Sequence, residues 1–573
     1  MSERDSRPFT EKKERVWSGA HRPCQRVPRD STRLAIPSPS PTIATSYWPA
    51  PRSTVSVIVP SSRYVSTPYR MLMSAPYLAL RASGAAPAGR PPMRGARINA
   101  RGRVRNSRRL GAFLDMSRQF TYSTSLPTCE TWSFGRGPGN VSTGFVGRNA
   151  GQRPSGEDRP MKRQPVITGL GIVSPIGVGV DKFWASALAG RSGITHPTVF
   201  DGSKLPLDCR AVGEVLDFHP LEWMSASAAK VSGRFSQFAI AAARMARVDS
   251  ALDRAGLAPE DLKVSIGTSM NGQVDLGEST FTAYLRGKPI SPWTTNEYPA
   301  HAATSHIAIE AGAHGQTITF STACAAGLDS IGWAAEEIRR GHARAALAGG
   351  TETPLSAYSM MLFHSVGVLS QWPGPPEEAS RPFDGWHSGL VLAEGSAVVV
   401  IEEEESARAR GAPIYARILS LACTSEGAHL RKVDHSGHAV GRAMTMALTQ
   451  AGLSANEIDF ICAHGNSMPD YDAAETAGIK LAFGQRAWSV PVSSLKSMCG
   501  QALAASSAMQ VVGSCLALRD GEIPPTINYS ERDPACDLDY VPNTARVARV
   551  RNVMIHAHSL GGSHVAMILG APD

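Results

Sequence analysis

The sequence predicts an α/β fold of two halves whose sheets are largely buried. Short apolar segments typical of buried strands alternate with longer segments of helical periodicity, and this series runs twice along the chain. Of the 573 residues, 42% are hydrophobic and only 19% are charged, which is enough apolar content for one large two-lobed unit. We expect the first half to cover 161–410 and the second half to cover 411–573.

The first half opens with the apolar run Pro165–Val173, which we interpret as a buried strand that ends in a turn. A helix is expected next, over Val180–Leu188. Further strands are expected at 263–267, 317–320, 345–347 and 395–401, with helices at 235–255 and 328–340.

The second series begins near Ile414. Its clearest members are a strand at 459–462, a helix at 502–518 and a final strand at 565–569. The two halves share this alternation without any visible repeat of individual residues, so the prediction of two halves rests on pattern alone.

Residues 1–160 differ in composition from the rest. They hold 26 Lys and Arg against 9 Asp and Glu, whereas 161–573 hold 32 against 40. The stretch is rich in Pro, Ser, Gly and Arg and has no sustained period of 2 or 3.6, which predicts a disordered extension. Three interpretations of this extension compete: an organellar transit-like segment, a functional tail, and upstream sequence translated by mistake. We favour the last, with the start at Met161, because regular patterning begins there and the acidic opening fits a transit peptide poorly.

Cysteine and charge patterns narrow the class of protein. The nine cysteines form no CxxC pair and no zinc-like His/Cys spacing, which predicts free thiols in a reducing, cytoplasmic compartment and no metal. No apolar run reaches the ~18 residues that span a bilayer. The body from 161 onward is mildly acidic, so we expect neither nucleic acid nor membrane as a partner.

Cys324 is the strongest local sign of chemistry. It lies in the segment STACAAG, between the strand-like 317–320 and a helix that runs to Arg340. At a helix N-terminus, free backbone N–H groups and the helix dipole favour a thiolate and can bind an oxyanion. The small neighbours allow a thioester to approach. A buried structural cysteine is the alternative.

Three downstream features lie where strands meet turns. His464 follows the strand-like 459–462, and Lys496 lies in a small-residue turn between a strand and a helix. Gly561–Gly562 precedes the last strand. Taken singly, each has an ordinary alternative: a loop histidine, a surface lysine and a tight turn.

Together these segments resemble the condensing ketosynthases of fatty-acid and polyketide synthesis, above all the β-ketoacyl-ACP synthase II type of the thiolase superfamily. The resemblance covers essentially all of 161–573 and implies a thiolase-like layered αβαβα fold of two similar halves. The blocks that carry it, in family order, are VITGLGIVSPIG, STACAAG, AGGTET, SRPFDGWHSGLVLAEGSAVVVIE, AHGNSMPDYDAAET, VSSLKSMCGQALAA and PPTINY.

The resemblance also implies roles. Cys324 falls on the nucleophile, which takes an acyl chain from a thioester. His464 falls on the first catalytic histidine, which stabilises the malonyl enolate, and Lys496 falls on the lysine that supports it. Glu394 matches a largely structural glutamate near the site. Leu560 falls on the gate beside the acyl pocket, and its backbone N–H would join that of Cys324 in an oxyanion hole.

The sequence departs from the family at several of these positions. Gln501 stands where the second catalytic histidine is expected; its amide cannot titrate but still donates a hydrogen bond. Asn466 and Met468 replace two threonines that contact the pantetheine arm, which alters arm recognition. His558 and His564 are extra imidazoles near the oxyanion loop, and either one is a candidate to replace the missing histidine.

These features lead us to expect a condensing enzyme that joins a Cys324-bound acyl chain to a malonyl thioester with loss of CO2. Two alternatives remain: an acyltransferase that works without decarboxylation, with His464 as general base, and a non-catalytic partner that sets chain length beside an active ketosynthase. The resemblance implies an acyl carrier protein as partner, a homodimer and no cofactor.

Overall fold

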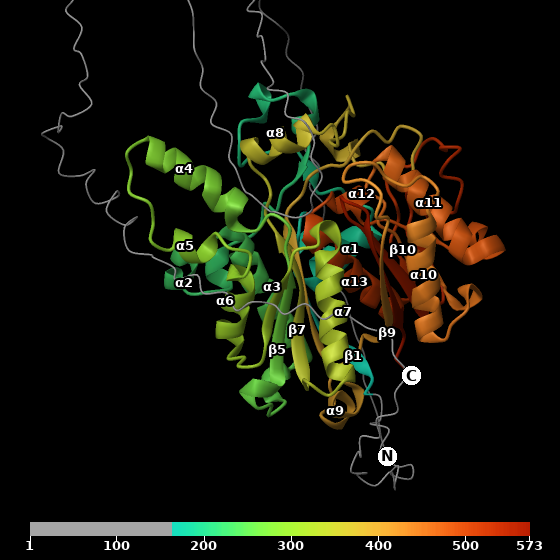
Figure 1. Cartoon of the computed structure of the whole chain (residues 1–573), viewed down its shortest axis with the longest axis horizontal. Helices are drawn as coiled ribbons and strands as arrows, with labels where there is room; N and C mark the ends of the chain where they lie inside the picture. Colours follow the sequence, from blue (N-terminus) through green and yellow to red (C-terminus); the bar gives the residue numbers. More distant parts are fainter. Residues whose placement is uncertain (1–162, 573) are drawn as a thin grey trace, which may run out of the picture. The chain divides into compact units, whose positions relative to one another are not determined.

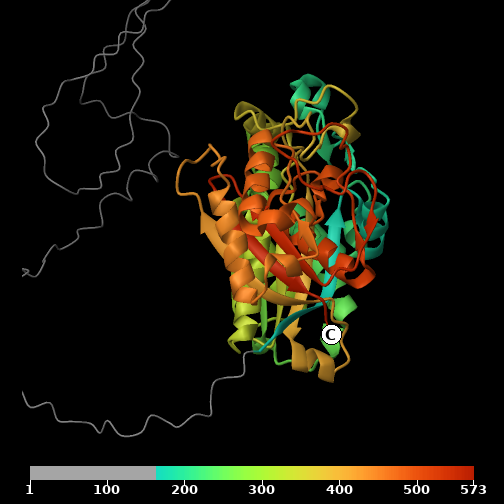
Figure 2. The same cartoon turned by 90° about the vertical axis from the view of Figure 1, so that its right-hand side faces the viewer.

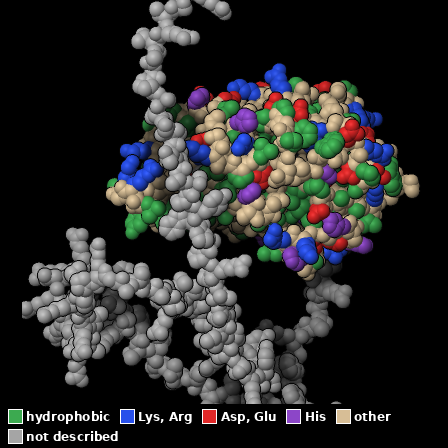
Figure 3. Space-filling view, turned by 90° about the horizontal axis from the view of Figure 1, so that it is seen from above, with side chains coloured by type: hydrophobic (Ala, Val, Ile, Leu, Met, Phe, Trp, Pro, Cys, Tyr) green, Lys and Arg blue, Asp and Glu red, His purple; other side chains and the backbone are tan. Residues whose placement is uncertain are grey.

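A computed structural model describes residues 163–572 (Figures 1 and 2). The predicted extension over 1–160 lies outside the described residues. Among the helices of 163–572, none is both long and apolar enough to cross a bilayer. On the face drawn in Figure 3, acidic and basic side chains are interspersed with apolar ones.

Within residues 163–572, ten strands form the path of the main sheet, with β2 (Gly177–Val178) paired to β1 at its side. In chain order they are β1 (Pro165–Ser174), β5 (Leu262–Gly267), β6 (Thr317–Phe320), β7 (Ala345–Glu352), β8 (Gly395–Glu403), β9 (Ala416–Ser425), β10 (Phe460–Cys462), β11 (Val492–Ser493), β14 (Asn552–His558) and β15 (Ser563–Gly570). The α-helices are α1 (Val180–Leu188), α2 (Ala226–Val231), α3 (Arg234–Ser250), α4 (Glu278–Leu285), α5 (Thr294–Glu297), α6 (Ala302–Ala311), α7 (Ala326–Arg339), α8 (Ala357–Ser365), α9 (Glu404–Ala409), α10 (His438–Ala451), α11 (Pro469–Phe483), α12 (Lys496–Cys499) and α13 (Leu503–Asp520).

The two halves share one strand topology, which confirms the prediction of two similar halves. The spatial order is β6-β5-β7-β8-β1 in the first half and β11-β10-β14-β15-β9 in the second. In each half the second strand in the chain is parallel to both of its neighbours, and the last two pairings are antiparallel. A short β1–β9 pairing joins the halves into one continuous sheet, and the chain passes between them from β8 to β9. The boundary placed at residue 410 stays a prediction.

Alternating side chains of each strand enter different apolar clusters, which produces the layers. In the first half, Val398 and Val400 of β8 pack with α3 and α6, whereas Val399 and Ile401 pack into a central cluster that includes α7 and α13. In the second half, β10 and β14 divide in the same way between the central cluster and the α10–α11 side. Because successive strand residues face opposite sides, the result is the expected αβαβα layering.

Helices α7 and α13 form the central layer and pack closely through small residues. A Cβ added to Gly327 of α7 would lie 2.5 Å from the carbonyl oxygen of Ala504 in α13, so only glycine fits there. Helix α7 follows β6 after one short turn, and α13 follows β11 after the short helix α12. The contact therefore places the starts of two corresponding helices next to each other.

Strand β7 is longer than predicted, running to Glu352 rather than ending at 347. Glycine is a poor strand former, so the continuation of the strand through Gly349–Gly350 is not indicated by strand propensity. In the structure these glycines allow close packing: a Cβ on Gly349 would lie 2.0 Å from the carbonyl oxygen of Ala397. The other predicted elements agree with the structure to within a few residues at their ends.

Candidate active site

Cys324 lies in a single helical turn, Ala323–Ala325, between β6 and α7. Ala323 has φ +54°, a left-handed conformation that is costly for alanine. Ser559, from the other half, holds the turn: its hydroxyl donates to the carbonyl of Thr322 (2.6 Å) and accepts from the N–H of Ala325 (2.9 Å). Cys324 is buried, with 6% of its surface exposed. Contacts across the two halves therefore fix the position of the sulfur.

The expectation of a lowered pKa for Cys324 is wrong. Burial dominates and raises the pKa of the thiol above its ordinary value. A contact from the side chain of Gln501, the positive charge of Lys496 and a hydrogen bond from the backbone N–H of Leu560 act in the opposite direction without outweighing burial. The thiol is protonated at neutral pH, so its proton must leave when the sulfur attacks a thioester.

His464 presents one free N–H. Its Nδ1 accepts a hydrogen bond from the backbone N–H of His558 (3.2 Å), so the ring proton lies on Nε2. Within residues 163–572, Nε2 has no hydrogen-bond partner, although His464 is only 2% exposed. Burial, helped by the charge of Lys496, holds the pKa of His464 well below its usual value, so the ring is neutral. The result is a buried, fixed and unused donor.

Lys496 and Glu475 hold the backbone around His464. The Nζ of Lys496 donates to the carbonyl of His464 (2.6 Å) and to Oε1 of Gln510 (3.2 Å). The carboxylate of Glu475 accepts from the N–H groups of His464 (2.7 Å) and Gly465 (2.8 Å). Burial lowers the pKa of Lys496. Glu475 and Gln510 were missed in the sequence, because a buried polar network appears only once the chain has folded.

Gln501 lies beside the sulfur and is 1% exposed. Its backbone is fixed from both sides: its N–H donates to the carbonyl of Val391 (2.7 Å), and its carbonyl accepts from Ala393 (3.0 Å). Among the described residues neither Nε2 nor Oε1 of the amide has a partner with full hydrogen-bond geometry. The side chain does lie close enough to lower the pKa of Cys324, so we interpret the contact as an imperfect hydrogen bond to the thiol.

Three further predicted site residues lie near Cys324 or His464. Asn466 is buried and turns back on its own loop, where Oδ1 accepts from the N–H of Met468 (3.1 Å). Met468 packs on an apolar cluster that includes Cys324. Leu560 is 38% exposed, and its backbone N–H reaches Cys324.

Glu394 precedes β8, and the contacts of its carboxylate are with the loop at Val215 and with α3. Its carboxylate pairs with Arg234 (2.6 Å) and accepts the backbone N–H of Val215 (2.9 Å). A buried carboxylate that ties a loop and a helix to the start of β8 fits a structural role.

Two buried acidic groups near the site were also missed. Glu352, at the end of β7, accepts backbone N–H groups from 269–271, yet burial raises its pKa to about 7. Glu426 lies against His558 and His564, and the ring of His558 lies 4.2 Å from that of Tyr471. His558 and His564 therefore belong, with Glu426, to a second buried polar group next to His464.

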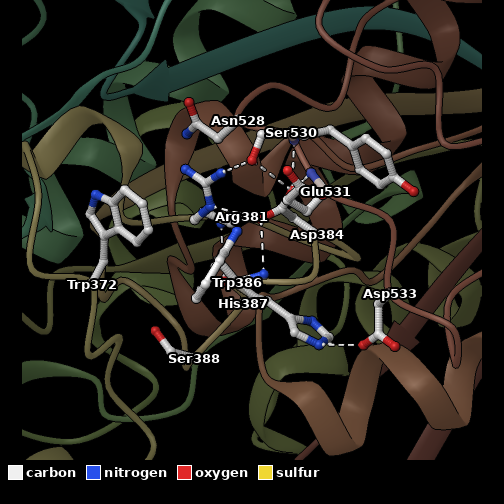
Figure 4. Close-up of polar contacts among 12 residues, drawn as sticks. Trp372, Arg381, Asp384, Trp386, His387, Ser388, Asn528, Ser530, Glu531 and Asp533 are labelled. Carbon is white, nitrogen blue, oxygen red and sulfur yellow. Dashed lines mark hydrogen bonds and ion pairs between the residues drawn. The ribbon is translucent and has the colours of Figure 1, made fainter.

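A loop at 380–389 ties the first half to the second through buried ion pairs (Figure 4). Arg381 pairs with Asp384 (2.9 Å), and the carboxylate of Asp384 accepts from the backbone N–H groups of 530 and 531. His387 bridges two carboxylates: Nδ1 lies 2.9 Å from Asp472, and Nε2 lies 2.9 Å from Asp533. Asp472 also accepts the N–H of residue 466, so this network supports the loop that carries His464.

The charge of His387 predicts a pH dependence of stability. Burial acts to lower its pKa, but the hydrogen bonds and charges of Asp472 and Asp533 outweigh burial and raise it. The stabilisation is therefore complete below the unfolded pKa of about 6.5 and is lost as pH rises through the folded pKa. We expect His387→Gln to cost about 3 kcal/mol in urea unfolding at pH 6 and distinctly less at pH 9. The exposed His435→Gln is the matched control, and an equal cost at both pH values would contradict the assignment.

Comparison with known proteins agrees with this geometry. Residues 163–407 match the family described as "Beta-ketoacyl synthase, N-terminal domain", and residues 415–530 match "Beta-ketoacyl synthase, C-terminal domain". The tetracenomycin polyketide synthase ketoacyl synthase alpha subunit of Streptomyces glaucescens is 38% identical over 425 residues, covering 72% of this chain and 98% of the relative. The 3-oxoacyl-[acyl-carrier-protein] synthase 2 of Coxiella burnetii is 38% identical over 410 residues, covering 71% of this chain and 98% of the relative.

Comparison with solved structures also finds ketosynthases. A type II PKS acyl-carrier protein in complex with its ketosynthase bound to the hexaketide matches with a TM-score of 0.67 and 32% identity. The ishigamide ketosynthase/chain length factor matches with a TM-score of 0.67 and 34% identity. Each match covers 72% of this chain and 100% of the solved one. The chain is therefore a member of the β-ketoacyl synthase family, the acyltransferase-type condensing enzymes of fatty-acid and polyketide synthesis.

Proposed function

We propose that this chain catalyses a decarboxylative Claisen condensation between an acyl group on Cys324 and a malonyl group on an acyl carrier protein. The observation that carries the proposal is a pair of buried donors that lack a partner of full hydrogen-bond geometry within residues 163–572: Nε2–H of His464, and the amide of Gln501, which contacts the thiol of Cys324. A buried donor without a partner is costly, and such groups occur where a ligand completes them.

In the first step the sulfur of Cys324 attacks the carbonyl carbon of an acyl thioester. The C–S bond to Cys324 forms, and the bond to the carrier sulfur breaks; the carrier thiolate takes up the proton that leaves the cysteine. The oxygen of the tetrahedral intermediate carries a negative charge. In this proposal the backbone N–H groups of Cys324 and Leu560 donate to it, which would lower the barrier for acyl transfer; the contact of the Leu560 N–H with Cys324 supports this role.

In the second step malonyl thioester loses CO2. The electrons of the broken C–C bond move into an enolate, whose oxygen accepts hydrogen bonds from His464 Nε2–H and from the amide of Gln501. The enolate carbon attacks the acyl carbonyl, and the sulfur of Cys324 leaves as a thiolate that recovers a proton. The product is a β-ketoacyl thioester on the carrier protein.

Gln501 takes the place of the family's second catalytic histidine in this proposal. Because an amide and an imidazole Nε2–H both donate, the substitution preserves the hydrogen bond to the enolate and removes any proton relay. We expect Gln501→Leu to lower kcat for condensation about 100- to 1000-fold with acylation of Cys324 retained. Gln501→His, which restores a donor, should keep most of the activity. Full activity in Gln501→Leu would remove the amide from the mechanism.

Further parts of the proposal concern partners. The solved complex between a ketosynthase and its carrier protein supports an acyl carrier protein as donor. We further propose that Asn466 and Met468 line the path of the pantetheine arm and that the partly exposed Leu560 is the gate. Strand β6 is an edge of the sheet, and its side chains are partly exposed, which supports pairing with a second copy in a homodimer. A cytoplasmic location remains a prediction.

The deciding experiment uses malonyl-carrier protein labelled at the free carboxylate, with and without an acyl donor. We expect release of labelled CO2 together with a β-ketoacyl product, and an acyl adduct on Cys324 by intact-protein mass spectrometry. An adduct without CO2 release would indicate a non-decarboxylating acyltransferase. No adduct with any donor would indicate a non-catalytic partner subunit.

A further inference from the structure

Glu426, His558 and His564 come together at the ends of three adjacent strands. His558 ends β14, and His564 lies directly opposite it near the start of β15, so both imidazoles project from the same face. Glu426 follows β9, the next strand along, and its N–H donates to the carbonyl of Gly562 (2.8 Å). The ring centroids of the two histidines lie 4.0 Å apart.

The group is rigid because its backbone is fixed on every side. The turn between the two histidines is closed by hydrogen bonds from Ser559 to Ser563 (2.8 Å) and from Gly562 to Ser559 (3.0 Å). A Cβ on Gly562 would lie 2.9 Å from Cβ of Glu426, so glycine makes room for the carboxylate. Such a site needs little reorganisation to bind a ligand.

The polar atoms of the group lack sufficient partners. The side chains of Glu426, His558 and His564 are 2%, 1% and 0% exposed. Within residues 163–572, both ring nitrogens of His558 and Nδ1 of His564 have no hydrogen-bond partner. The carboxylate of Glu426 accepts the backbone N–H of Asp434 at Oε2 (3.1 Å) and is paired at Oε1 with these histidines, without Lys or Arg among its ion-pair partners. A bound cation would give the unpartnered imidazole nitrogens a ligand and would neutralise the buried carboxylate.

The spacing of the ligand atoms fits a metal ion. Oε1 of Glu426 lies 3.1 Å from Nε2 of His564 and 3.5 Å from Nε2 of His558, and one ligand atom from each residue lies within 4.8 Å of the others. In four-coordinate zinc sites with bonds of about 2.0–2.2 Å, neighbouring ligand atoms are roughly 3.3–3.6 Å apart. Two histidines and one carboxylate are a common ligand set for zinc.

We propose that Glu426, His558 and His564 form a binding site for a divalent transition metal of the zinc class, with a fourth position left open. Spacing in the sequence does not indicate this ligand set, because Glu426 and His564 are 138 positions apart. The site lies next to the reaction centre: the backbone N–H of His558 donates to Nδ1 of His464, and the turn after His558 carries Leu560. A bound ion would therefore hold both the His464 ring and the Leu560 N–H in place.

The test titrates the full chain, stripped with a chelator, with Co²⁺ as a spectroscopic probe and then with Zn²⁺ as competitor. The titrations are made in the Cys324→Ala variant, so that the thiol of Cys324 cannot bind the metal. We expect one Co²⁺ per chain with the visible absorption of a four-coordinate ion, displaced by Zn²⁺, and a rise in Tm with Zn²⁺. Binding should fall 100-fold or more in His564→Asn and in Glu426→Gln, and should be unchanged in His435→Asn, an exposed imidazole on the neighbouring loop.

Several results would overturn the proposal. The proposal fails if the parent chain does not bind Co²⁺, or if His564→Asn binds it as tightly as the parent chain. It also fails if His435→Asn loses binding, because the ion would then lie on the surface. Far-ultraviolet circular dichroism and the Tm without metal show whether the variants fold. If His564→Asn fails to fold, the anomalous signal of Co²⁺ in crystals of the parent chain decides the position, and an ion bound elsewhere contradicts the assignment.

Discussion

Cys324→Ala is expected to abolish both the acyl adduct and condensation, with a loss on the order of 10⁴- to 10⁶-fold in kcat. In the proposed mechanism the sulfur forms the covalent bond to the acyl group, and Ser559 holds the turn that carries it. Without it, no acyl group is held next to the enolate. Intact-protein mass spectrometry after incubation with acyl-carrier protein measures the adduct, and product analysis measures condensation.

The matched control is Cys423→Ala, which removes an exposed thiol that is hydrogen-bonded to the carboxylate of Asp329. It should keep both the adduct and condensation. Decarboxylation of malonyl-carrier protein is expected to persist in Cys324→Ala, because the two enolate donors are intact. An acyl adduct of undiminished yield in Cys324→Ala would place the nucleophile elsewhere and contradict the mechanism.

His464→Ala is expected to separate the two steps. It removes the unused Nε2–H, so release of CO2 and condensation should fall about 100- to 1000-fold in kcat, while the acyl adduct on Cys324 still forms. Single-turnover mass spectrometry follows the adduct, and labelled CO2 follows decarboxylation. His464→Gln, which keeps an N–H donor on the side chain, should recover part of the lost rate.

Exposed His435→Ala serves as the control for removal of an imidazole and should leave both steps unchanged. Loss of the adduct in His464→Ala would mean that the ring acts as the base for acylation, which favours a non-decarboxylating acyltransferase. Normal CO2 release in His464→Ala would show that its buried N–H serves no catalytic purpose.

Much of the fold followed from the sequence, because apolar strands buried on both faces leave a clear pattern. The helix at 180–188 and the strand at 317–320 were predicted with the bounds that the structure has. The strand β14 gave a weaker signal, because His556 and His558 interrupt its apolar run although both are buried. A prediction based on hydrophobicity misses such a strand, because buried polar residues at a site break the apolar pattern.

The sequence singles out site candidates where a residue stands out in a motif, whereas their environment is not visible in it. Cys324 and His464 were selected because each follows a strand within a short motif of small residues. The pKa of Cys324 was predicted in the wrong direction, because the helix position is visible in the sequence and the extent of burial is not. Ser559 and Glu475 act only through partners that are distant in the chain.

The shared topology of the two halves divides the candidate site between them. Cys324 follows β6, and Lys496 and Gln501 follow β11, the corresponding strand of the other half, with α7 and α13 in contact between them. Neither half alone holds all three residues. Under the proposed mechanism, a chain that ends before β11 would carry the thiol without Lys496 and Gln501 and would be inactive.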